Sequence, residues 1–253
     1  MPLGNFIDEA RRLVDAARAR GITLRIMGAT AFMIHSSRFS HLQESLAREI
    51  SDIDFMSYSA QRDKIVDFFL KMGYQFDRRR LMIMRYFNRY IFDDPENKRV
   101  SDVFFDRLEM CHTIDFKDRL EIDYPTVPLA DLLLEKLQIV QIMEKDVKDC
   151  VILLREHEVG DKDQETVNAK YVSELLSRDW GFYYTSTTNL EKIKSSVRDY
   201  NTLQEEDKAD VISKISRLQE EIELAPKSAR WKMRAKIGPK QKWYRDVEEV
   251  ERS

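Results

Sequence analysis

Apolar residues in the first quarter of the chain follow helical and extended patterns in turn. Over 6–18 they recur three and four positions apart, which predicts an amphipathic helix that ends before Gly21. Short runs at 22–27 and 52–57 have the pattern of strands. Each run is followed by a stretch with helical spacing, at 29–34 and at 65–72. This region is therefore predicted to pack helices against a layer of strands.

The middle of the chain is rich in strand-forming residues, and the rest is helical. Strands are expected at 74–77, 82–92, 99–106 and 120–124. Pro125 and Pro128 then interrupt the chain. Beyond them, helices are expected at 129–143, 146–157, 165–177, 190–200 and 205–224.

These patterns predict an α+β fold, in which a sheet flanked by helices is followed by a C-terminal helical domain. With 253 residues, the chain is long for one compact core and short for two full ones. We place the domain boundaries at 1–125 for the sheet, 126–225 for the helices and 226–253 for a basic, aromatic C-terminal segment.

The composition excludes several classes of protein. Hydrophobic residues make up 43% of the chain, too many for a disordered protein. The longest stretch without Asp, Glu, Lys or Arg is 26–37, whereas a membrane-spanning helix needs ~20 apolar residues. The two cysteines, Cys111 and Cys150, are too few for a disulfide framework or a four-thiolate zinc site. Because the N-terminus also lacks the pattern of a secretory signal, we expect a cytoplasmic protein without a membrane segment.

Positive charge is concentrated near the C-terminus. The segment 226–245 holds eight Lys and Arg residues and no acid, whereas the rest of the chain has a formal charge of −11. Trp231, Trp243 and Tyr244 lie among these cations. Because cations bind phosphates and aromatic rings stack on bases, the segment could bind RNA. The alternative is a tail whose Trp residues pack on the core while its cations pair with the acidic body.

Two aspartates lie on the predicted strand 52–57. Asp52 and Asp54 are two residues apart, so their carboxylates project from one face, ~6.6 to 6.8 Å apart along the strand. Two buried like charges repel each other unless a cation neutralises them, and a hard divalent ion with oxygen ligands suits this pair. The alternative is a strand whose other face meets solvent.

A third acid strengthens the case for a metal site. Asp102 lies among apolar residues on the predicted strand 99–106, where an unpaired charge would be costly. Asp106 is on the same face, but strand ends commonly carry a turn-forming Asp, so we favour Asp102. Three acids on neighbouring strands could hold two Mg²⁺ ions ~3.5 to 4 Å apart, an arrangement that serves in-line attack on phosphorus.

The turn after the first predicted strand has the composition of a phosphate-binding element. Gly28, Ala29 and Thr30 precede a predicted helix, where backbone N–H groups can receive a phosphate. A single glycine at the end of a strand is also ordinary turn chemistry. Taken together, the turn and the three acids predict a site that binds both a phosphate and metal ions.

These residues resemble the nucleotidyltransferase superfamily that includes DNA polymerase beta. The similarity is closer to the abortive-infection nucleotidyltransferases, the toxin component of some type IV toxin–antitoxin systems. Residues 28–31 (Gly-Ala-Thr-Ala) look like the first motif of that family, and Arg48 with 52–54 (Asp-Ile-Asp) looks like the second. Residues 131–137 and 145–149 resemble its two helical motifs. The resemblance covers about residues 20–155.

The resemblance implies a nucleotidyltransferase domain over 1–125, with the mixed sheet of that fold. It implies a Mg²⁺-dependent transfer of a nucleoside monophosphate from an NTP to an acceptor hydroxyl. The implied catalytic metal ligands are Asp52, Asp54 and Asp102, and the implied nucleotide-binding residues are Gly28, Ala29, Thr30, Arg48 and Lys136. Lys136 would contact the triphosphate. The alternative for Lys136 is a solvated lysine on a helix. For the motif 145–149, the alternative is a plain surface ion pair between Lys145 and Asp149.

The acceptor is left open by the sequence. The basic C-terminal segment favours RNA, and the resemblance adds a toxin function with an antitoxin partner. The alternatives are a protein or small-molecule acceptor on the same fold, or a non-catalytic module that binds nucleotide or RNA. Residues 36–49 lengthen the separation between Gly28 and Asp52 beyond the family norm and are interpreted as an insertion.

Overall fold

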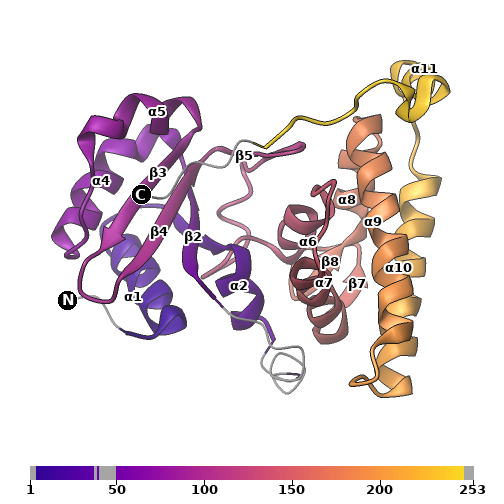
Figure 1. The fold of residues 1–253 in the computed structure, drawn as a ribbon, viewed down its shortest axis with the longest axis horizontal. Helices are drawn as coiled ribbons and strands as arrows, with labels where there is room; N and C mark the ends of the chain where they lie inside the picture. Colours follow the sequence, from indigo (N-terminus) through magenta and orange to yellow (C-terminus); the bar gives the residue numbers. More distant parts are fainter. Residues whose placement is uncertain (1–3, 37–38, 40–49, 248–253) are drawn as a thin grey trace.

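The computed structural model describes residues 4–36, 39 and 50–247. Figure 1 shows two halves side by side, one built from strands with their covering helices and the other from helices of the C-terminal part. The α+β class expected from the sequence is confirmed, because a mixed sheet and many helices both form. Within the described ranges, no helix is both long and apolar enough to cross a membrane.

The main sheet has four strands in the order β1-β2-β4-β3. They are β1 (Leu24–Met27), β2 (Asp52–Ser57), β3 (Arg89–Asp94) and β4 (Arg99–Phe105). The outer pairs, β1 with β2 and β3 with β4, are antiparallel, whereas the central pair β2 and β4 is parallel. The central register sets Asp54 opposite Asp102.

Among the described residues, four α-helices belong to the half that contains the sheet. They are α1 (Phe6–Arg18), α2 (Gly28–Ile34), α4 (Arg62–Lys71) and α5 (Leu81–Tyr86). Phe69 of α4 stacks on Phe92 of β3 with 4.1 Å between ring centroids, which fixes the helix on the sheet. In Figure 1, α2 lies between the sheet and the helical half, and it contacts the first two helices of that half. The expected bounds of α1 and β2 are confirmed.

The segment 81–94 differs from the expected strand over 82–92. Its first part is the helix α5, and β3 begins only at Arg89. Asn88, with a φ of 52°, turns the chain between them. The apolar run in α5 is too short for its period to distinguish a helix from a strand.

The strands expected at 74–77 and 120–124 do not form, although the structure describes both segments. At 74–77, Gln75 alone pairs with Asp93, in an isolated bridge. Residues 120–124 form turns and bends. Elsewhere in the chain, two short pairs of strands form that the sequence pattern did not indicate. They are β5 (Arg107–Glu109) with β6 (Thr113–Asp115), and β7 (Glu158–Gly160) with β8 (Thr166–Asn168).

The helical half contains five helices ahead of the basic segment. They are α6 (Leu129–Leu137), α7 (Glu144–Glu156), α8 (Ala169–Leu176), α9 (Trp180–Asp199) and α10 (Glu205–Leu224). The bounds expected for α10 are confirmed, whereas α9 begins ten residues before the expected 190–200 helix. Asp179 explains this early start, because its carboxylate accepts hydrogen bonds from the N–H groups of Gly181 and Phe182.

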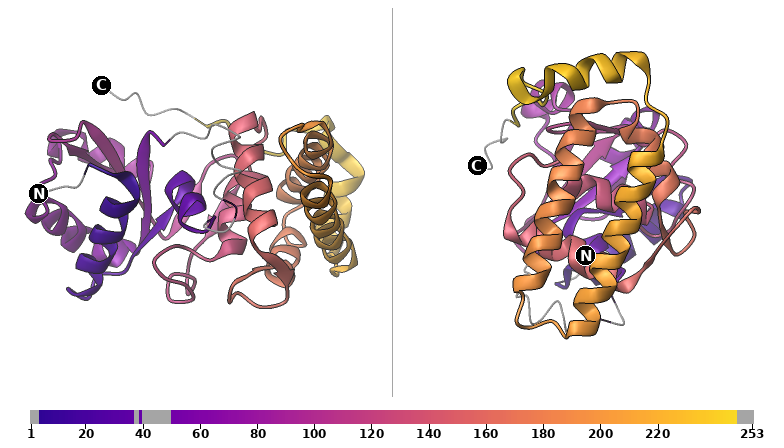
Figure 2. Two further views of the ribbon diagram at one scale, coloured as in Figure 1. Left: turned by 90° about the horizontal axis from the view of Figure 1, so that it is seen from below. Right: turned by 90° about the vertical axis from the view of Figure 1, so that its right-hand side faces the viewer.

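The basic segment forms another helix, α11 (Ala229–Ile237), after Ser228 caps its start. In the right-hand view of Figure 2, α9 and α10 run side by side and α11 lies across their upper ends. The chain then returns toward the sheet, and in Figure 1 this return passes beside β5.

Candidate functional site

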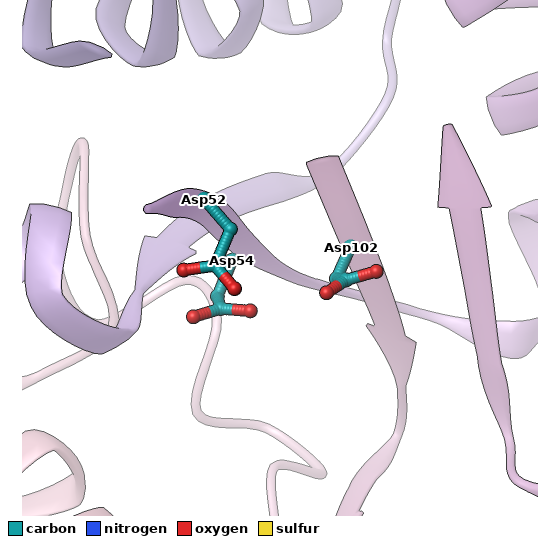
Figure 3. A group of neighbouring side chains, drawn as sticks. All are labelled: Asp52, Asp54 and Asp102. Carbon is teal, nitrogen blue, oxygen red and sulfur yellow. The ribbon is translucent and has the colours of Figure 1, made fainter. Parts of the chain in front are cut away.

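Three aspartates meet on the central strands of the sheet. Asp52 and Asp54 come from β2 and Asp102 from β4, and each offers a carboxylate oxygen within 4.8 Å of the other two. Figure 3 shows their side chains next to one another on the two neighbouring strands. The register explains this meeting, because Asp54 lies opposite Asp102 and Asp52 is two residues away on the same face. The structure thus brings together the three acids that the sequence singles out.

The crowding of these acids changes the ionisation of Asp54. Burial first, and then the charges of Asp52 and Asp102, raise the pKa of Asp54 to about 8. The positive charges of Arg89 and Lys136 oppose this rise. In the absence of a cation, the Asp54 carboxyl therefore holds a proton at neutral pH. Three carboxylates are the donor set that a hard ion such as Mg²⁺ prefers, so these residues fit such an ion.

Arg89 is a neighbour of the acids that sequence analysis missed. It lies on the edge strand β3, and its guanidinium pairs with the buried carboxylate of Asp102. The same guanidinium lies 5.2 Å from the ring centroid of Phe104. The sequence does contain a signal for Arg89, because an arginine is the first residue of an apolar strand. The sequence does not reveal its partner, which depends on the pairing of β3 with β4.

Gly28 lies close to the side chain of Asp54. Its φ is +62°, and a Cβ atom at this position would be 2.4 Å from Oδ2 of Asp54. Its N–H donates a hydrogen bond of 3.0 Å to Oε2 of Glu135, on α6. A glycine here thus leaves room for the Asp54 carboxylate while the turn is tied to the helical half.

Glu135 is the second residue that sequence analysis missed. Its side chain is buried, and burial raises the pKa of its carboxyl well above the usual range. The other carboxyl oxygen, Oε1, is buried without a hydrogen-bond partner among the described residues. Nothing in the sequence distinguishes Glu135 from a surface residue of an amphipathic helix.

The remaining residues of the predicted phosphate turn are less directly placed. Thr30 is 1% exposed, and its hydroxyl donates to the carbonyl oxygen of Asp52 at 3.4 Å. Of the three turn residues, Gly28 lines the cavity described below, whereas Ala29 and Thr30 are not among its lining residues. Arg48 lies outside the described residues, as does most of the interpreted insertion at 36–49.

Lys136 joins the two helical motifs. Its Nζ lies 3.0 Å from a carboxylate oxygen of both Asp146 and Asp149, on α7. These carboxylates raise the pKa of Lys136 despite its burial. Lys136 is therefore not a solvated helix lysine. The carboxylate of Asp149 pairs with Lys136. On the same helix as Asp149, Lys148 pairs with Glu144.

A cavity of about 650 Å³ lies between the sheet and the helical half. Its volume is in the range of sites for small-molecule ligands. Charges of both signs line each side: Arg89 lies on the sheet side together with the acids, and Glu135 and Asp146 lie on α6 and α7 together with the lysines. The lining includes Asp52, Asp54, Glu135, Arg89, Lys136 and Lys145.

A second cavity, of about 600 Å³, lies beside the first and shares Cys111, Tyr244 and Arg245 with it. We call it the basic groove. Its cations are Arg178, Arg230, Arg234, Lys242 and Arg245, and its aromatic residues are Trp180, Trp231, Trp243 and Tyr244. The groove thus has the composition expected for 226–245, with additions from the junction of α8 and α9.

The tryptophans of the basic segment are docked on the helical half. Nε1 of Trp231 donates to the carbonyl oxygen of Leu176, and Nε1 of Trp243 donates to Oγ1 of Thr185. Most of the cations nevertheless remain exposed, including Arg230, Lys232, Lys236 and Lys240. The two sequence-based alternatives therefore each describe a part of the segment: its rings pack, while its charges face solvent.

No protein-family model matches the chain, and no curated protein matches it either. The function is therefore inferred from the residues of the site.

Proposed function

We propose that the chain is a Mg²⁺-dependent nucleotidyltransferase, which transfers a nucleoside monophosphate from an NTP to an acceptor hydroxyl. The observation that carries the proposal is the convergence of Asp52, Asp54 and Asp102, of which Asp52 and Asp54 line a cavity large enough for a nucleotide. Three carboxylates crowded together, of which that of Asp102 is fully buried, repel one another unless cations neutralise them. The sequence resemblance to nucleotidyltransferases points to the same three residues.

The residues around the cavity suit the steps of this reaction. Asp52 and Asp54 would hold the metal ions, and Asp102 would complete their shell and receive the proton of the acceptor hydroxyl. The hydroxyl oxygen attacks the α-phosphorus, the bond to the bridging oxygen of the β-phosphate breaks, and pyrophosphate leaves. Bound Mg²⁺ would neutralise the charge that develops on the transferred group.

The lysines of the cavity lining would receive the triphosphate. Lys136 and Lys145 line the cavity on α6 and α7, beside Glu135 and Asp146, and Gly28 lines it at the turn after β1. Lys136 is held by two carboxylates, so its ammonium group has a fixed position before any substrate binds. Positioning and charge neutralisation are the main sources of catalysis in phosphoryl chemistry of this kind.

We propose RNA as the acceptor because the basic groove adjoins the cavity and shares three lining residues with it. Its cations suit a phosphate backbone, and the shared residues Tyr244 and Arg245 place the groove next to the acids. A cytoplasmic toxin function, with an antitoxin partner, is part of the proposal and rests on the sequence resemblance alone.

A label-transfer assay tests the proposal. Wild-type protein is incubated with Mg²⁺, each α-³²P-labelled NTP in turn and RNA, protein or small hydroxylated acceptors. Asp54→Asn is expected to lower transfer by roughly a hundredfold or more, because it removes a charge that the transition state needs. Asp106→Asn is the matched control. Asp106 directly follows β4, its carboxylate accepts a hydrogen bond from the N–H of Ser59, and it is not among the cavity-lining residues.

Two outcomes would contradict the proposal. Equal transfer by Asp54→Asn and wild type would show that the assigned acids do not carry the reaction. Mg²⁺-dependent NTP binding in calorimetry without transfer to any acceptor would instead indicate a non-catalytic binding module.

A further inference from the structure

Residues 243–247, which we call the C-terminal strap, contribute to one wall of the cavity that Asp52 and Asp54 line. Tyr244, Arg245, Asp246 and Val247 are among the residues that line this cavity. The strap passes from the start of α9 to the β5–β6 hairpin, and Figure 1 shows the chain crossing between the two halves there. A segment more than a hundred residues from the acids in sequence therefore closes part of their site.

The helical half provides a seat for the first residue of the strap. A Cβ atom at Gly181, in the first turn of α9, would lie 2.4 Å from the carbonyl oxygen of Trp243. Nε1 of Trp243 donates a 3.0 Å hydrogen bond to Thr185, one helical turn further on. The ring also meets Tyr184 edge-on, with 5.1 Å between centroids. The strap thus packs against α9 at a point where any side chain larger than hydrogen would displace it.

The hairpin provides a second anchor two residues later. The N–H of Arg245 donates to the carbonyl oxygen of Cys111 at 3.0 Å. Its guanidinium donates to the carbonyl oxygen of Met110 at 3.2 Å and to Oγ1 of Thr113 at 2.8 Å. Arg245 therefore contributes backbone and side-chain bonds to docking.

Tyr244 lies between these two anchors and lines both the cavity and the basic groove. Its ring meets Trp243 edge-on at 5.2 Å, and Nζ of Lys242 lies 5.1 Å from its centroid. The indoles of Trp231 and Trp243 are engaged in hydrogen bonds that dock the segment. Tyr244, in contrast, lines both cavities. An aromatic ring beside a cation is the usual platform on which a base stacks.

We propose that the C-terminal strap completes the substrate site and that Tyr244 stacks on a nucleobase of the substrate. This inference rests on the proposed function and names a binding residue for it. The base belongs either to the NTP or to the terminal nucleotide of the acceptor, and steady-state kinetics separates the two sources.

The first experiment measures KM and kcat of label transfer for Tyr244→Leu. Base stacking is worth about 1–3 kcal/mol, so the KM for the stacked substrate is expected to rise by roughly 5- to 150-fold. A rise for the NTP assigns the base to the NTP, and a rise for the acceptor assigns it to the acceptor. Tyr244→Phe, which keeps the ring, is expected to raise the same KM far less than Tyr244→Leu.

The second experiment moves the strap without touching the cavity. Gly181→Ala adds a methyl group against the Trp243 carbonyl, at a helical position where alanine is otherwise favourable. Faster hydrogen exchange of the Arg245 amide is expected, together with the KM change seen for Tyr244→Leu and no further change in the double variant. Gly4→Ala is the control, because its Cβ would make an ordinary 3.7 Å contact.

The outcomes separate this inference from the proposed function. An unchanged KM in Tyr244→Leu, with wild type active and Asp54→Asn inactive, would overturn the role of Tyr244 alone. Faster exchange in Gly181→Ala with unchanged kinetics, or unchanged exchange, would overturn the role of the strap. If wild type shows neither transfer nor Mg²⁺-dependent NTP binding in calorimetry, the proposed function fails, and the nucleobase assignment fails with it.

Discussion

The side chain of Asp54 occupies the space that a Cβ atom of Gly28 would need, since that atom would lie 2.4 Å from Oδ2 of Asp54. The pairing of β1 with β2 produces this arrangement, because Met27 lies opposite Asp54 and the chain turns immediately afterwards. Gly28 therefore meets two separate requirements, a positive φ and the absence of a side chain. These two requirements can be tested separately.

Gly28→Ala is expected to reduce label transfer by roughly a hundredfold, because its methyl group would push the Asp54 carboxylate out of place. Gly21→Ala is the matched control. Gly21 has a φ of +65° but nothing within 4 Å of a Cβ atom, so its variant bears the same backbone strain without a collision. Both variants are expected to lose about 1–2 kcal/mol of unfolding free energy from strain. Equal activity of the two variants would show that the contact with Asp54 is irrelevant to function.

Lys136→Met is expected to lower the free energy of unfolding by about 3–5 kcal/mol, because Asp146 and Asp149 would lose a buried cation. Urea denaturation measures this loss. Lys148→Met is the control, since Lys148 pairs with Glu144, whose side chain is 70% exposed, and such a pair is worth about 1 kcal/mol or less. A loss below that of the control would mean that the two carboxylates find other partners. Activity of Lys136 variants should be compared only after this measurement.

The three acids of the site could be predicted from the sequence because each reveals itself locally. Asp52 and Asp54 occupy polar positions of an alternating strand, and Asp102 lies among apolar residues. Their meeting requires that the two strands are neighbours in a register that sets Asp54 opposite Asp102, which the parallel pairing of β2 and β4 provides. A side chain whose own strand marks it as unusual is therefore accessible to sequence analysis.

Glu135, Arg89 and the C-terminal strap could not be predicted in this way. Glu135 has its role because α6 packs beside the turn at Gly28, 107 positions away in sequence. Arg89 meets Asp102 through the register of an edge strand. The strap reaches the cavity through its contacts with Gly181 and Cys111, and local composition cannot reveal such contacts.

Acidification is expected to destabilise the protein through two histidines, the half-buried His35 and the buried His112. Burial lowers the pKa of His35 to about 4, with a further contribution from His157, and burial lowers the pKa of His112 to about 4 as well. In the unfolded chain both titrate near 6.5. Their contribution to stability is therefore complete above about pH 6.5 and is lost as the pH falls toward 4, by up to about 1.4 kcal/mol per pH unit for each histidine.

Urea unfolding between pH 8 and pH 4.5 measures this effect. His35→Gln and His112→Gln are each expected to flatten the acid limb, although each also costs some stability by removing a hydrogen bond to Thr126 or Thr185. The slope of stability against pH is therefore the diagnostic quantity. An unchanged slope in both variants would show that these imidazoles are protonated in the folded protein at the same pH as in the unfolded chain.

The Asp54 carboxyl is expected to produce a pH dependence of the opposite sign. Its folded-state pKa of about 8 exceeds its unfolded value of about 3.8, so the folded protein holds a proton that the unfolded chain releases. Without divalent cations, stability is expected to fall as the pH rises between these values, by up to about 1.4 kcal/mol per pH unit. Between about pH 4 and 6.5 this slope opposes that of the histidines, so pH 6.5 to 8.5 is the range in which to measure it.

In that range, Asp54→Asn is expected to abolish the decline, because an amide resembles the protonated carboxyl and does not titrate. Addition of Mg²⁺ to wild type is expected to raise the melting temperature more at pH 8.5 than at pH 6.5, since binding must displace the proton from Asp54. Asp106→Asn should retain both behaviours, because Asp106 is outside the cluster of three acids. A Mg²⁺-induced shift of equal size in wild type and Asp54→Asn would place the bound ion elsewhere, and with it the charge compensation on which the proposed site depends.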